Sequence, residues 1–120
     1  MSMPARTIYY FAWIMVLEVV VMLASPAPLL QMAHIAAYDA VWLRVIAGIV
    51  GGLTIYYFTI ARMEVRALFP VTAYERSTVF VVILALYLFD RAHFVVLLVG
   101  VLDFLGALWT LWAIKSEAKQ

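Results

Sequence analysis

Four long apolar runs, separated by short polar segments, account for nearly the whole chain. They cover residues 7–24, 40–61, 70–89 and 94–114, and each is close to the roughly 20 residues with which an α-helix crosses the hydrocarbon core of a bilayer. Because no backbone polar group can stay unpaired in lipid, runs of this length are expected to be helical. The pattern predicts an all-α fold, a four-helix transmembrane bundle that forms a single domain over residues 1–120.

Prolines and one acid mark the ends of the predicted helices. Pro26 and Pro28 stop the first span because proline lacks the amide that continues a helix, and Pro70 suits the first position of the third span. Asp39 can cap the second span by accepting hydrogen bonds from its free amides. The apolar segment 28–38 between the first two spans is too short to cross, so we expect an interfacial or re-entrant segment there.

Composition agrees with this fold and excludes several functions. Apolar residues make up 68% of the chain, far above soluble domains, and the net charge of +1 argues against a nucleic-acid partner. The chain has no cysteine, and its two histidines, His34 and His93, fall in separate loops. We therefore predict no metal site and no cofactor. Nor does the sequence contain a Ser-His-Asp set or a Gly-rich phosphate loop, so no catalytic residue is predicted.

The basic residues predict how the bundle is oriented. With four spans, both termini and the second loop share one side of the membrane, and that side carries Arg6, Arg62, Arg66, Arg76, Lys115 and Lys119. Only Arg44 and Arg91 lie on the other side. An excess of basic residues marks the cytoplasmic face, so both termini are expected in the cytoplasm. On that face we expect a solvated cluster formed by Arg62, Glu64, Arg66, Glu75 and Arg76, with binding to anionic lipid headgroups as the alternative.

Two acids, Glu18 and Asp103, stand alone in the middle of apolar spans. Glu18 lies 11 residues after the start of the first span and Asp103 lies 12 residues before Lys115, which places both about 16–18 Å deep. A charged group at this depth is costly and marks a functional site by default, so we predict a ligand or proton site formed by Glu18, Asp103 and Arg44. The alternatives are that each acid is a protonated carboxyl group that only hydrogen-bonds between helices, and that the Arg44 side chain extends to the outer interface.

Small residues recur at helical spacing on two spans. Gly48 and Gly52 form a GxxxG pair, with Arg44 one turn before them, and Gly100 and Gly106 flank Asp103 on the last span. Such stripes let neighbouring backbones approach closely, so we predict that these four glycines pack helices together and face inward around Asp103. The aromatic run of Tyr56, Tyr57 and Phe58 is typical of an interfacial belt.

The second half of the chain resembles a known group of small membrane proteins. The segment Gly52-x3-Tyr56-x4-Ala61-Arg62 and the later run Asp103-x2-Gly106-Ala107-Leu108 are similar to the DoxX-like four-span bacterial proteins. This resemblance implies a bundle in the bacterial cytoplasmic (inner) membrane, often with an accessory role. It carries over no established catalytic residue.

Three functional hypotheses follow. The first is a non-catalytic binding protein that holds a partner, either a membrane protein or a second copy, or an apolar small molecule, with membrane lipids around it. The second is a proton-coupled exporter, since the chain is similar to small multidrug exporters in length and in its Glu at mid-span, although residues 77–89 contain neither Gly nor Trp. The third is a lipid or sterol-type isomerase that uses the acids to move protons.

Overall fold

The computed structural model describes residues 1–32, 40–89 and 94–118, and over these ranges every regular element is a helix. Four helices are long and apolar enough to cross a membrane: α1 (Met3–Ala24), α3 (Ala40–Arg62), α4 (Phe69–Phe89) and α5 (Phe94–Ala118). A 3₁₀ turn, η2 (Arg66–Leu68), leads directly into α4. The prediction of an all-α chain with four apolar, membrane-length helices is therefore confirmed.

Local chemistry explains where α1 begins and ends. The hydroxyl of Ser2 accepts a hydrogen bond from the Ala5 amide at 3.4 Å, and Pro4 occupies the first turn. This capping starts the helix four residues before the predicted start of the span. At the other end Ser25 adopts a left-handed conformation, with φ 43°, and Pro26 follows it, so the helix cannot continue.

The segment between the first two spans holds a short helix, α2 (Ala27–Met32), which contributes no buried residue. Its interfacial or re-entrant position stays a prediction. The rest of that segment, with His34 and Asp39, and the loop holding Arg91 and His93, lie outside the described residues. The predicted cap of the second span by Asp39 therefore remains a prediction as well.

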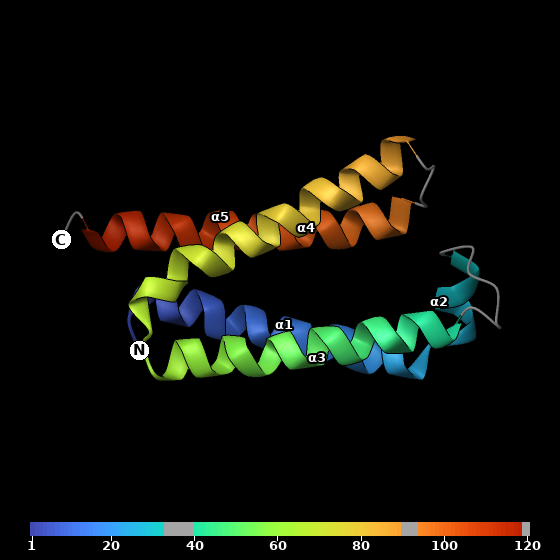
Figure 1. Ribbon diagram of the computed structural model, residues 1–120, viewed down its shortest axis with the longest axis horizontal. Helices are drawn as coiled ribbons and strands as arrows, with labels where there is room; N and C mark the ends of the chain where they lie inside the picture. The colour runs from blue at the N-terminus through green and yellow to red at the C-terminus, as the bar shows by residue number, and fades with distance from the viewer. Residues whose placement is uncertain (33–39, 90–93, 119–120) are drawn as a thin grey trace.

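The four long helices form two hairpins that lie side by side (Figure 1). α1 pairs with α3, α4 pairs with α5, and α1 also packs along α5, which makes α1 the helix that joins the two hairpins. The molecule is elongated, 50 × 27 × 18 Å, which is long enough to cross the hydrocarbon core and reach the headgroups on both sides. The start of α1, the end of α5 and the connection from α3 to α4 all lie at one end.

The core is concentrated toward that shared end. A buried cluster joins α1, α3 and the start of α4, and consists of Ala5, Ile8, Phe11, Ala12, Met15, Tyr57, Ala61 and Phe69. Elsewhere large apolar side chains point outward, such as Ile55 at 68% and Phe89 at 83% exposure. In lipid this arrangement carries no hydrophobic penalty, because acyl chains are as apolar as the side chains they touch.

The glycines divide into two groups. A Cβ on Gly100 would lie 3.1 Å from Ile83, and one on Gly106 would lie 2.6 Å from Phe11, so these two allow close approach of neighbouring helices. Gly48 and Gly52 instead face open space, with nothing within 4 Å of a Cβ placed there. The expectation that these two glycines face inward toward Asp103 is therefore wrong for the single chain, because α3 buries other residues, namely Ala47, Thr54, Tyr57 and Ala61.

Candidate functional site: a polar interior between four helices

Glu18 lies on the face of α1 that points into the bundle. Phe11 lies four residues before Met15, and Met15 lies three residues before Glu18, so all three share one face of the helix. Phe11 and Met15 are both buried. Glu18 itself is half-buried, and its Oε1 atom is inaccessible to solvent and accepts no hydrogen bond from any residue in the described ranges. An unsatisfied buried oxygen costs about 1–3 kcal/mol, so this carboxyl group requires a proton or an external donor.

Asp103 lies on the face of α5 that looks toward the same interior. The hydroxyls of Thr7 and Thr110 are 2.8 Å apart and Phe11 packs on Gly106, which defines an antiparallel register between α1 and α5. Extending this register puts Glu18 beside Val99, about 6 Å along the axis from Asp103. Asp103 is half-buried, and it lies within direct electrostatic reach of Glu18, Glu75 and Arg76.

Arg44, the third member of the predicted site, lies elsewhere. Its side chain is exposed, and its Nε donates a hydrogen bond to the backbone carbonyl of Leu23 at 3.2 Å, near the end of α1. Among the described residues, ion pairs are made by Arg66 alone. The structure thus brings Glu18 and Asp103 toward one another and leaves Arg44 outside.

Among the described residues, the most deeply buried charged side chain is that of Arg76, on α4, which is 2% exposed. Its Nε donates to the carbonyl of Thr72 at 3.2 Å, and its Nη2 donates to the hydroxyls of Thr110 at 2.9 Å and Thr72 at 3.3 Å. Thr110 in turn shares a hydrogen bond with Thr7. The expectation that Arg76 belongs to a solvated cytoplasmic cluster is therefore wrong: Arg76 points inward and ties α4 to α5 and, through Thr110, to α1.

The remaining face of the Arg76 guanidinium is covered by aromatic rings. Its central carbon lies 4.6 Å from the ring centroid of Phe11 and 5.6 Å from that of Tyr57, distances at which cations and aromatic faces attract. The Nη1 atom, which has no hydrogen-bond partner among the described residues, sits beside Gly106. Close packing at Gly106 leaves little room for a ligand at Nη1. Arg76 therefore acts as an internal charge whose hydrogen bonds hold α4 against α5.

Tyr57 connects α3 to this interior. Its hydroxyl lies within hydrogen-bond distance of the Thr72 carbonyl, at 3.2 Å, and of a carboxylate oxygen of Glu75. Tyr57 is 2% exposed, whereas Tyr56 is 67% exposed. The interfacial-belt interpretation is therefore wrong for Tyr57, because consecutive residues of a helix point in different directions and only Tyr56 faces outward.

Among the described residues, the interior holds three carboxyl groups and one guanidinium. Asp103 and the half-buried Glu75 lie near the buried cation Arg76, and Glu18 lies near Asp103, so the site favours protons or a cationic or hydrogen-bond-donating group. In the described ranges no three acids or histidines are placed to hold a metal ion. Comparisons with protein-family models, curated proteins and solved structures find no match for this chain. Fold and site together define a helical integral membrane protein with a polar interior.

Proposed function

We propose that this protein is a non-catalytic membrane protein that binds an apolar ligand, or an apolar segment of a partner, which carries a hydrogen-bond donor. The carboxyl groups of Glu18 and Asp103 receive that donor. The observation that carries the proposal is the buried Glu18 Oε1, which accepts no hydrogen bond within the described chain. Its position on the same face of α1 as the buried side chains of Phe11 and Met15 supports a ligand that is otherwise apolar.

The proposed setting is the bacterial cytoplasmic membrane, with both termini in the cytoplasm. Arg6, Arg62 and Lys115 lie exposed toward the shared end of the bundle, which is the distribution of the positive-inside rule. The DoxX-like resemblance of residues 48–114 supports the same setting and an accessory role.

Binding of a long-chain alkylamine to the purified protein in mild detergent tests the proposal. Loss of a hydrogen bond to a charged group costs about 1.5–3 kcal/mol, so Glu18→Gln combined with Asp103→Asn should weaken binding about tenfold or more. Glu64→Gln, the same chemical change in the connection between α3 and α4, is the matched control and should bind as the parent chain does. Equal affinity of the doubly substituted protein and the control would refute the assignment.

A proton-coupled exporter of apolar cations is the second candidate, and the electrostatic proximity of Asp103 to Glu18 favours it. In an exporter the same carboxyl groups hold protons and substrate in turn, so binding of tetraphenylphosphonium should release protons into a weakly buffered solution. Proton release that disappears in Glu18→Gln supports the exporter. Cation binding without proton release supports the binding protein.

A further inference from the structure

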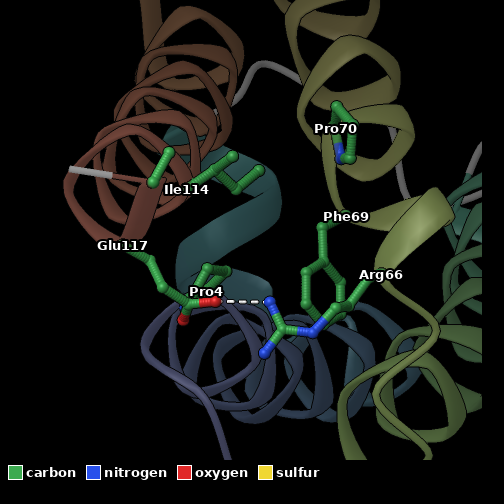
Figure 2. A pocket seen from close by; sticks show the side chains of 7 residues that line it. Pro4, Arg66, Phe69, Pro70, Ile114 and Glu117 are labelled. Carbon is green, nitrogen blue, oxygen red and sulfur yellow. Dashed lines mark hydrogen bonds and ion pairs between the residues drawn. The ribbon is translucent and has the colours of Figure 1, made fainter. Parts of the chain in front are cut away.

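A pocket of about 290 Å³ opens at the shared end of the bundle, far from the Glu18–Asp103 site (Figure 2). It lies where the start of α1, the start of α4 and the end of α5 meet. Its lining combines apolar side chains with one cation and one anion: Pro4, Phe69, Pro70, Ile114, Ala118, Arg66 and Glu117. Figure 2 shows Arg66 and Glu117 pointing toward one another beside Pro4 and Phe69.

The depth of this pocket matches the headgroup layer of a bilayer. The third membrane-length segment begins at Arg66 and the fourth ends at Ala118, so the pocket stands at the limit of both spans. Headgroups extend beyond the hydrocarbon core on either side and meet the protein at this level. Phe69 and Ile114, on the apolar wall, belong to the spans themselves and can contact the first part of an acyl chain.

The charges of the pocket favour one kind of headgroup. The Arg66 guanidinium donates from Nη1 to Glu117, and its Nη2 lies 3.8 Å from Glu64. The lining itself therefore carries one cation and one anion that are already paired, which matches a zwitterionic headgroup better than a purely anionic one. The Arg66 and Glu117 side chains stay 58% and 28% exposed, so both can accept a further partner, and an ion pair this exposed contributes little by itself.

We propose that the pocket binds the headgroup of a zwitterionic phospholipid that carries a primary ammonium. The phosphate contacts Arg66, the ammonium donates to Glu117, and the first acyl carbons lie on Phe69 and Ile114. A phosphate prefers the amino-terminal end of a helix and an ammonium the carboxyl-terminal end, and these are the ends that α4 and α5 present here. A choline headgroup has no N–H to donate and should bind less well.

Native mass spectrometry from mixed micelles with equal amounts of phosphatidylethanolamine, phosphatidylcholine and phosphatidylglycerol tests this proposal. The parent chain should retain phosphatidylethanolamine preferentially. Glu117→Gln should abolish the preference over phosphatidylcholine, and Arg66→Gln should lower retention of both lipids roughly two- to fivefold, the range for one exposed charged contact. Arg62→Gln, an exposed arginine outside the pocket, is the matched control and should leave retention unchanged.

Several results would overturn the proposal. Equal retention of the three lipids would mean annular lipid only, and preference for phosphatidylglycerol would mean an anion site. Identical behaviour of Arg66→Gln and Arg62→Gln would remove the pocket as the location. Binding of water-soluble phosphoethanolamine as tightly as the lipid would contradict the role of the apolar wall. None of these outcomes depends on Glu18 or Asp103, so this test and that of the proposed function fail independently.

Discussion

Replacing Gly106 with alanine tests the contact that joins the two hairpins. A Cβ at this position would lie 2.6 Å from Phe11 Cδ2 and 3.0 Å from Arg76 Nη1, whereas carbon atoms in favourable contact are about 3.5–4.0 Å apart. Phe11 is 2% exposed and its ring lies 4.6 Å from the Arg76 guanidinium carbon, so the ring can move only by displacing a second buried side chain. The substitution therefore forces α1 and α5 apart, or it forces the Phe11 side chain into an unfavourable rotamer.

The size of the effect follows from two opposing contributions. Overpacking a well-filled core costs about 1–3 kcal/mol, and replacing glycine with alanine inside a helix gains up to about 1 kcal/mol. Gly52→Ala gains the helical contribution alone, because nothing lies within 4 Å of its Cβ. The difference between the two variants isolates the overpacking, and Gly106→Ala should be less stable than Gly52→Ala by about 1–3 kcal/mol.

Unfolding by sodium dodecyl sulfate in mixed micelles, followed by the loss of helical circular dichroism, measures this difference. Gly106→Ala should unfold at lower detergent content than the parent chain, and Gly52→Ala at the same or higher content. Equal unfolding midpoints for the two variants would show that Phe11 does not pack on Gly106 and would refute the arrangement of α1 against α5.

Three further substitutions probe other parts of the structure. Arg76→Met keeps most of the side-chain volume but removes the hydrogen bonds to Thr72 and Thr110, so it should destabilise the bundle by about 1–3 kcal/mol in the same detergent titration. Arg76→Ala should lose about 2–5 kcal/mol, because it also leaves a cavity. Tyr57→Phe should cost about 1 kcal/mol because its hydroxyl makes buried contacts, while Tyr56→Phe, whose side chain is exposed, should change nothing in that titration. The backbone N–H and the side chain of Ser2 hold the pKa of Glu64 below its ordinary value. The stabilising contribution of Glu64 is therefore present above the unfolded-state pKa of about 4.3, and it is lost as the pH falls through the lower folded-state pKa. Thermal unfolding of Glu64→Gln should therefore differ from that of the parent chain at neutral pH and converge with it in acid; a constant difference would contradict this role.

The helices were predictable because their cause is local. The length of each apolar run and the prolines at 26, 28 and 70 set four helices whose ends differ from the predicted spans by a few residues. The capping by Ser2 and the extension of α5 to Ala118 were not predicted, since polar residues at the ends of a span can either continue the helix or leave it.

The orientation of each helix was harder to predict because it depends on the neighbours. Arg76 lies seven residues inside α4, close enough to the end of the helix to suggest an exposed side chain. Its side chain is buried because it donates hydrogen bonds to Thr72 and Thr110, and Thr110 is held in turn by Thr7. A signal was present in the sequence, since Thr72 and Arg76 are four residues apart on one helix face. Gly48 and Gly52 of α3 were predicted to face inward, but they face open space. A stripe of small residues indicates that a helix can pack closely, but it does not indicate which helix it packs against.

A double-mutant cycle with Glu18→Gln and Asp103→Asn tests most directly whether these two acids form one site. Stability is measured by the detergent titration for the parent chain, both single variants and the double variant. If the carboxyl groups share the interior between α1 and α5, the effects should be non-additive, with an interaction free energy of about 0.5 kcal/mol or more. Effects that add to within about 0.3 kcal/mol would mean that the two groups do not sense one another, and would contradict the site from which the proposed function is drawn.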